Sequence, residues 1–291
     1  MNPTAFNPSI AFICASAVAA IAAVLWATGA LRSRALSDCP VRELDLTPLD
    51  FLVAFFLMFV FGGGLLRLVM PALGLNPDED LDLRSLPSLQ AASFVLLSQL
   101  VTQLPAVIYI AVRAGRQENG LTYFGLRRPR GPKHVGAALI ALVLVIPLVF
   151  AAIRLTVEIG EAFGQPVPDS GHEMLSAMQG SDTAAATAMM ILSAVLVAPV
   201  LEEIIYRGLV QTVLVGLLGR SNRWPPVLLT SVLFALIHTG SVAWQTLPAL
   251  FLLALVLGWL YERTGSLVPS ILVHVGFNGV NTVLALKQNV F

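Results

Sequence analysis

Long apolar runs separated by short polar segments dominate the chain. Mainly hydrophobic residues occupy positions 9–31, 49–70, 90–113, 134–154, 184–217, 225–240, 244–261 and 266–286. A helix needs about 20 such residues to cross the hydrocarbon core of a bilayer. The runs therefore predict an all-α fold, a polytopic bundle of about eight transmembrane helices. The sixth and seventh runs are short or separated only by residues 239–243, so seven spans or a half-span stay open as alternatives.

Composition agrees with an integral membrane protein whose main partner is the lipid bilayer. Of 291 residues, 57% are hydrophobic and 12% charged, against about 25% charged in soluble domains. The 17 basic and 17 acidic residues cancel, so no excess positive charge favours nucleic acid. The cysteines, Cys14 and Cys39, can build neither a thiolate metal site nor a disulfide framework. The run 9–31 is too long for the apolar core of a signal peptide and lacks a basic leader, so we expect a retained helix.

Charged residues alternate between successive connections. Basic residues follow the first, third and fifth runs, at Arg32, Arg34, Arg42, Arg113, Arg116, Arg127, Arg128, Arg130, Lys133, Arg220 and Arg223. The connections around residues 78–82 and 158–182 are mainly acidic. Because cytoplasmic loops carry the excess of Lys and Arg, this pattern predicts that both termini lie outside.

A stretch with proline and glycine at residues 127–133 divides the chain into two parts. Residues 1–126 would hold about three transmembrane helices and the basic cytoplasmic loop, and residues 127–291 a catalytic membrane domain. The first part is expected to contain no buried ionisable group, so we expect the chemistry in the second part.

Three runs in the second part carry polar residues spaced four apart. These residues are Glu202, Glu203, Tyr206 and Arg207 in the fifth run, His238 with Phe234 in the sixth, and His274, Asn278 and Asn281 in the eighth. A spacing of four places side chains on one helix face. Since an unpartnered polar group in hydrocarbon costs several kcal/mol, the three faces should meet and form one site. Counted from the cytoplasmic ends, Glu202, His238 and His274 lie within about one and a half helical turns of one level.

Pro199 lies three residues before Glu202. Within a helix, proline removes one hydrogen bond and clashes with the carbonyl four residues earlier, here that of Val195, so a kink is predicted. A kink would help to admit water to Glu202. The alternative is a transmembrane proline that neighbouring helices simply tolerate.

Three short motifs resemble those of a known family. EEIIYR (Glu202–Arg207) matches the motif EExxxR, FALIH (Phe234–His238) matches FxxxH, and HVGFN (His274–Asn278) matches HxxxN of the CAAX-protease and bacteriocin-processing (CPBP, or Abi) family of intramembrane proteases. Each motif alone is weak, but all three occur in the family's order on apolar runs. The resemblance covers about residues 183–286, roughly a third of the chain.

The resemblance implies an intramembrane endopeptidase of a prokaryotic cytoplasmic (inner) membrane. Its substrate would be a membrane-associated peptide or protein. By analogy, Glu202 is the catalytic base that acts with His238 to activate water, while His274 and Asn278 stabilise the oxyanion. A tunable carboxylate and preorganised donors suit these roles chemically.

The remaining motif residues receive supporting roles. Arg207 is expected to neutralise Glu203, although the two could instead form a pair that only fixes packing. Phe234 and Tyr206 are expected to shape the pocket. Asn278 could also join helices through hydrogen bonds.

Whether a metal takes part separates two readings of the site. Glu202, His238 and His274 are a ligand set found in catalytic zinc sites, so a metalloprotease-like centre with a divalent metal such as zinc is one alternative. The HExxH spacing is absent, and we favour a site without metal or other cofactor. Two non-proteolytic alternatives stay open: a catalytically silent scaffold or bacteriocin-immunity protein of the same family, and a proton-coupled transporter that uses the same residues as a relay.

Overall fold

The computed structural model describes residues 8–27, 29, 33–36, 39, 45–79, 81–118, 120, 122, 132–165, 173–219 and 221–287, and these ranges form helices and their connections without a named strand. The helices are α1 (Pro8–Ala27), η1 (Ser33–Leu36), α2 (Pro48–Phe55), η2 (Phe56–Gly62), α3 (Gly63–Val69), η3 (Met70–Leu73), α4 (Ser88–Gly115), α5 (Pro132–Ala162), α6 (Glu173–Gln179), α7 (Ala184–Ile191), η5 (Leu192–Val197), α8 (Ala198–Glu203), η6 (Ile204–Gln211), α9 (Thr212–Leu218), α10 (Trp224–Ile237), η7 (Trp244–Thr246), α11 (Leu247–Thr264) and α12 (Leu267–Leu286). The predicted all-α polytopic bundle is confirmed.

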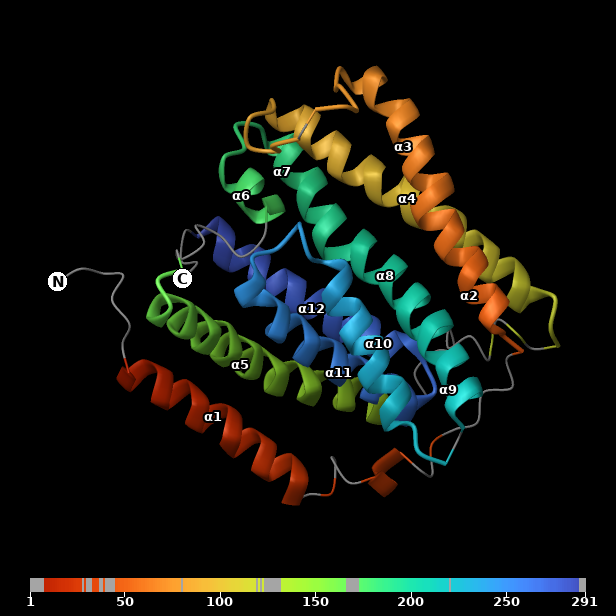
Figure 1. The fold of residues 1–291 in the computed structure, drawn as a ribbon, viewed down its shortest axis with the longest axis vertical. Helices are drawn as coiled ribbons and strands as arrows, with labels where there is room; N and C mark the ends of the chain where they lie inside the picture. The colour runs from red at the N-terminus through yellow and green to blue at the C-terminus, as the bar shows by residue number, and fades with distance from the viewer. Residues whose placement is uncertain are drawn as a thin grey trace.

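The motifs lie on α8 with η6, on α10 and on α12, which pack together at the middle of the bundle. Figure 1 shows α10, α11 and α12 in the middle, with the continuous rod α7–α9 beside them. Helices α2, α3 and α4 pack on one side of this rod, and α5 with α1 covers the other side of the centre. The site is therefore enclosed by helices from both parts of the chain.

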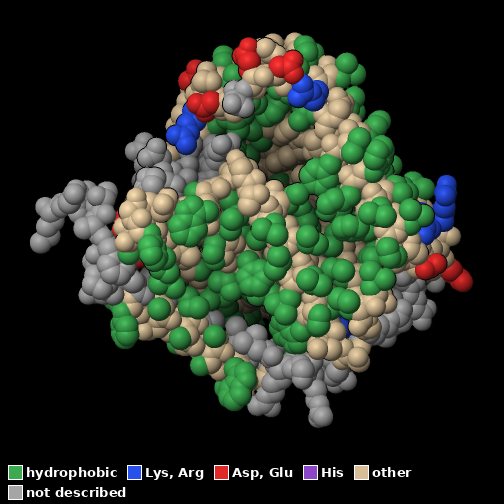
Figure 2. All heavy atoms as spheres, in the orientation of Figure 1, with side chains coloured by type: hydrophobic (Ala, Val, Ile, Leu, Met, Phe, Trp, Pro, Cys, Tyr) green, Lys and Arg blue, Asp and Glu red, His purple; other side chains and the backbone are tan. Residues whose placement is uncertain are grey.

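One face of the molecule is mainly apolar (Figure 2), as contact with a bilayer requires. Figure 2 shows a face dominated by hydrophobic side chains, with charged groups confined to its margins. Within the described residues, six helical stretches are long and apolar enough to cross a membrane: Pro48–Leu73, Ser88–Gly115, His134–Ala162, Ala184–Leu218, Trp244–Thr264 and Leu267–Leu286. The first predicted run forms α1, a helix of 20 residues.

The sixth predicted run is shorter than a spanning helix. α10 has 14 residues, about 21 Å at about 1.5 Å per residue, whereas the hydrocarbon core is about 30 Å thick. The chain leaves the helix at His238 and turns through Gly240, whose φ of 98° suits a residue without a side chain. This run therefore matches the half-span alternative.

Two features of the sequence analysis lie at the limits of the described chain. The boundary at residues 126 and 127 lies outside the described residues, as do the basic residues Arg32, Arg42, Arg127, Arg128, Arg130 and Arg220, whereas Arg113 and Arg116 are described. The orientation of the termini thus stays a prediction.

One expectation about the first part of the chain is wrong. Asp50 is buried, and its carboxylate pairs with Arg113 Nε at 2.6 Å and accepts a hydrogen bond from Tyr109 at 2.7 Å. Asp50 also closes a capping box with Thr47 at the start of α2. The expectation fails because the packing of α4 against α2 covers this end of α2 and buries the ion pair between Asp50 and Arg113.

The predicted interruption near Pro199 takes the form of a change in helix type. The π segment η5 ends at Val197, and Pro199 lies in the first turn of α8. A second π segment, η6, starts directly after Glu203. Such segments inside α-helices are frequent at functional sites. Here they flank α8, the six-residue α-helical segment that carries both glutamates.

A tight turn fixes α12 against α11. Gly265 ends α11 with a φ of 62°, a conformation that residues with a Cβ rarely adopt. Ser266 then caps α12, with its hydroxyl accepting from the Val268 amide at 3.3 Å. Because only these two residues separate the helices, α11 and α12 are antiparallel neighbours, and the buried face of α12 brings His274 to the centre of the bundle.

Candidate active site

Glu203, Arg207 and His274 form the buried centre of the site. Arg207 Nη1 donates to Glu203 Oε1 at 2.8 Å, the pairing that their spacing of four predicts. The same oxygen lies 2.9 Å from His274 Nδ1. Since a carboxylate only accepts, His274 Nδ1 carries a proton. Glu203 and Arg207 are fully buried and His274 is nearly so, which means that this arrangement is shielded from lipid and bulk water.

Glu202 lies on the other side of the same imidazole. Its Oε2 is 3.8 Å from His274 Nε2, and its side chain is 15% exposed while that of Glu203 has no exposure. The separation exceeds a direct hydrogen bond and is suited to a bridging water. Of the two adjacent glutamates, Glu202 is therefore the one placed to meet water and a substrate.

His238 joins the site through Phe234. The Phe234 ring lies 4.8 Å from the His238 ring and 5.9 Å from the His274 ring, measured between centroids. His238 Nδ1 is 2.6 Å from the Phe234 carbonyl, which can only accept, so Nδ1 carries a proton and Nε2 of the neutral ring is an acceptor. Tyr206 meets the same phenyl ring edge-on at 5.1 Å. The ring is thus the common wall of the site.

Arg207 has two further contacts that hold it in place. Its Nη2 donates to the Ala254 carbonyl of α11 at 3.1 Å, and its Cζ lies 4.9 Å from the Phe234 centroid, a cation–π contact. Ala254 cannot be identified from the sequence, because it contributes only a backbone oxygen. The residue type carries no signal of this role.

Asn278 binds a carbonyl that Pro199 leaves without a donor. In a π segment each amide bonds to the carbonyl five residues earlier, and for position 199 this carbonyl is Ala194. Proline has no N–H, and Asn278 Nδ2 donates to Ala194 O instead, at 2.8 Å. Asn278 therefore joins α12 to η5, the helix-joining alternative of the sequence analysis, and keeps its second N–H for another acceptor.

Asn278→Ala is expected to lower the free energy of unfolding by about 1 kcal/mol, because it leaves the Ala194 carbonyl unsatisfied at membrane depth. The measurement is denaturant titration of the protein in micelles. Asn281→Ala is the matched control, since the described residues show no interhelical hydrogen bond from Asn281. Equal losses in the two variants would contradict the role of Asn278.

The described ranges contain no group of three or more His, Cys, Asp or Glu side chains placed to share a metal ion. Glu202, His238 and His274 thus do not form such a group in this geometry. His172, which the sequence places beyond a span end, lies outside the described residues.

Comparison with known proteins agrees with the motifs. Residues 184–280 match the family model described as Type II CAAX prenyl endopeptidase Rce1-like. The chain is also 31% identical over 83 residues to UPF0177 protein YxdF of Lactococcus lactis subsp. lactis (strain IL1403). That match covers 28% of this chain and 42% of the relative, less than half of its length. No solved structure matches the chain. The segment that holds all three motifs is therefore similar to the Rce1-like CAAX endopeptidases, which confirms the family resemblance seen in the sequence.

Proposed function

We propose that the protein is an intramembrane endopeptidase that hydrolyses a peptide bond of a membrane-associated peptide or protein. The observation that carries this proposal is the imidazole of His274 held between two carboxylates, at 2.9 Å from Glu203 and 3.8 Å from Glu202. The similarity of residues 184–280 to CAAX prenyl endopeptidases supports it.

In the proposed reaction, Glu202 takes a proton from a water molecule as that water attacks the peptide carbonyl. Its partial exposure at the edge of the buried cluster suits this role. His238 offers Nε2 as a second acceptor for the same water, because its Nδ1 proton is held by the Phe234 carbonyl. Glu202 then returns the proton to the leaving amine.

The developing oxyanion needs donors. A protonated His274 supplies Nε2–H, and Asn278 supplies the amide N–H that Ala194 does not use. Once Glu202 has taken the water proton and is neutral, the charges balance, since the oxyanion and the Glu203 carboxylate oppose the guanidinium of Arg207 and one imidazolium. Glu203 and Arg207 hold the ring of His274 and take no proton from substrate.

The apolar surroundings favour a substrate with a lipid-like end. A prenylated C-terminal cysteine followed by aliphatic residues, the substrate type named for the matching family, is the first probe to try. The protein would act in a prokaryotic cytoplasmic (inner) membrane with both termini outside.

The test compares membranes of cells that carry wild-type or Glu202→Ala protein, at equal amounts of folded protein, by mass spectrometry of newly formed peptide termini. Termini present only with wild type are the expected result. A partner that needs the protein for its stability in both strains, without new termini, would instead indicate a scaffold or immunity protein. Proton-coupled flux through proteoliposomes that Glu202→Ala abolishes would indicate a transporter.

A further inference from the structure

The polar face that carries Glu203 and Arg207 continues for about one more helical turn along η6, to Gln211. All three side chains are fully buried and follow each other at a spacing of four. Gln211 Nε2 donates to the Gly258 carbonyl at 3.0 Å and to Glu262 Oε1 at 2.8 Å. Both partners only accept, so the orientation of the amide is fixed. Arg207 and Gln211 thus bind two carbonyls of α11, Ala254 and Gly258, that lie one turn apart.

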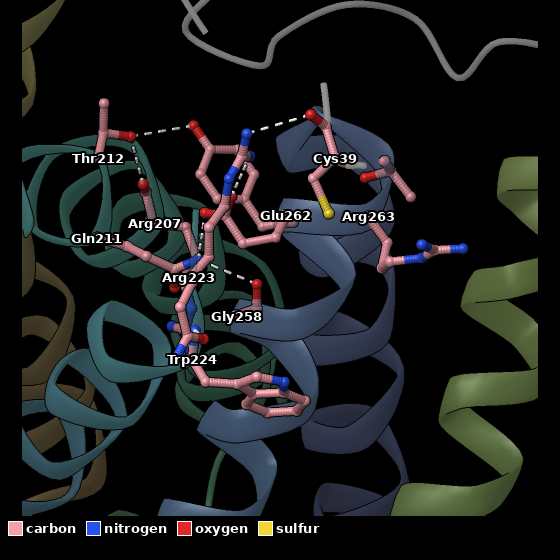
Figure 3. Close-up of polar contacts among 12 residues, drawn as sticks. Cys39, Arg207, Gln211, Thr212, Arg223, Trp224, Gly258, Glu262 and Arg263 are labelled. Atoms are coloured by element: carbon pink, nitrogen blue, oxygen red, sulfur yellow. Dashed lines mark hydrogen bonds and ion pairs between the residues drawn. The ribbon is translucent and has the colours of Figure 1, made fainter. Parts of the chain in front are cut away.

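The acceptor for Gln211 is itself held in place. Figure 3 shows Glu262 between Gln211 and Arg223, whose Nη1 donates to Glu262 Oε2 at 2.7 Å. Arg223 Nη2 donates to the Cys39 carbonyl at 3.1 Å. Glu262 and Arg223 are buried. A buried carboxylate with a charged partner and a fixed amide donor forms a rigid anchor.

Thr212 holds the backbone of Arg207. Its hydroxyl donates to the Arg207 carbonyl, five residues earlier, at 3.1 Å and lies 3.4 Å from the Tyr261 hydroxyl (Figure 3). This bond closes the end of the π segment η6. Arg207 is therefore fixed at its carbonyl by Thr212 and at its guanidinium by Glu203 and Ala254.

The fit between η6 and α11 requires a glycine. A Cβ at Gly258 would lie 2.7 Å from Gln211 Oε1 and 3.1 Å from Val227 Cγ1. The first distance is too short for any real contact, so a larger residue would push the Gln211 amide away from its two acceptors.

We infer that Gln211 and Thr212 are positioning residues of the proposed peptidase: they hold η6 on α11 so that Arg207 places Glu203 against His274. The inference rests on the proposed function. A shift of Arg207 moves Glu203 Oε1, and with it the imidazole that faces Glu202. Neither residue contacts the substrate in this scheme, so the chemical step should suffer while substrate binding does not.

The first test replaces one hydroxyl with a methyl group of the same shape. Thr212→Val is expected to lower kcat roughly tenfold to a hundredfold with KM within about twofold, since small displacements in an active site cost this much. The probe is an internally quenched, farnesylated peptide that ends in Cys-aliphatic-aliphatic-X. Thr230→Val is the matched control, because the buried Thr230 hydroxyl has no hydrogen-bond partner among the described residues, and its kcat should equal that of wild type. Thr212→Ser, which keeps the hydroxyl, should restore kcat.

The second test displaces the Gln211 amide by adding a methyl group at Gly258, which contacts it. Gly258→Ala should lower kcat in the same way, whereas Gly216→Ala on α9 should not, because a Cβ there meets nothing within 4 Å. Equal kcat for Thr212→Val and Thr230→Val, or a rise in KM alone, would overturn the positioning role. The proposed peptidase function would still stand if wild type cleaves the probe and Glu202→Ala does not.

A readout without substrate covers the case in which wild type does not cleave the probe. The ¹⁵N shifts of the His274 imidazole, assigned by comparison with His274→Gln, report the Nδ1 bond to Glu203. We expect them to change in Thr212→Val and to stay unchanged in Thr230→Val. Identical His274 shifts in all three proteins would refute the positioning role, whatever the protein's reaction is.

Discussion

Glu202→Gln is expected to reduce kcat for hydrolysis of the farnesylated probe on the order of 10³-fold. An amide of the same size cannot accept the proton that water must lose, so the reaction loses its base. Glu202 makes no ion pair with Arg207, and its contact with His274 is 3.8 Å long. We therefore expect the thermal unfolding midpoint to stay close to that of wild type, and the inactive protein to retain bound substrate for identification by mass spectrometry.

A matched control separates this effect from the general cost of removing a buried carboxylate. Glu158 is fully buried in α5, a helix that carries none of the three motifs, and pairs with Arg154. Glu158→Gln should lower the unfolding midpoint but keep kcat. Comparable kcat for wild type and Glu202→Gln would show that Glu202 is not the catalytic base. Absence of cleavage in both proteins would favour the scaffold or immunity protein.

The meeting of Glu202, Glu203 and His274 follows from spacing and hydropathy. Polar residues four apart share a helix face, and a polar face at membrane depth has to meet another one. These two rules indicate that the polar faces meet, but not which side chains pair: among the described residues no hydrogen bond or ion pair joins Glu202 to His238. The buried state of Glu203 and the pairing with Arg207 follow from the same reasoning.

Other features depend on backbone geometry that residue types do not encode. The π segment η5 has an ordinary apolar composition, and the polar residues of η6 give no sign of a π geometry, so only Pro199 marks a break. The Ala254 and Ala194 carbonyls act through atoms common to all residues. Asp50 and Arg113 lie 63 positions apart and meet because α4 packs on α2. Gln211 was the exception, since its place four residues after Arg207 could have extended the predicted polar stripe.

Arg207→Met is expected to destabilise the protein by about 3–5 kcal/mol, the usual cost of leaving one charge of a buried pair without its partner. Both side chains of the Glu203–Arg207 pair have no exposure, so neither water nor lipid head groups can replace the lost guanidinium. The apolar chain of methionine fills most of the vacated space, which limits the loss from packing. Denaturant titration in micelles measures the effect.

The double variant Glu203→Gln/Arg207→Met separates stability from catalysis. With both charges removed, the free energy of unfolding should recover to within about 1–2 kcal/mol of wild type, because a neutral pair costs little to bury. Activity should not recover, because the glutamine oxygen can still accept from His274 Nδ1 but no longer supplies the negative charge that stabilises the imidazolium of the proposed mechanism. A double variant as unstable as Arg207→Met would show that the arginine acts mainly through its bond to Ala254 and its contact with Phe234. An active double variant would show that the Glu203 carboxylate is not needed for hydrolysis. Glu202 and the two histidines would then be sufficient.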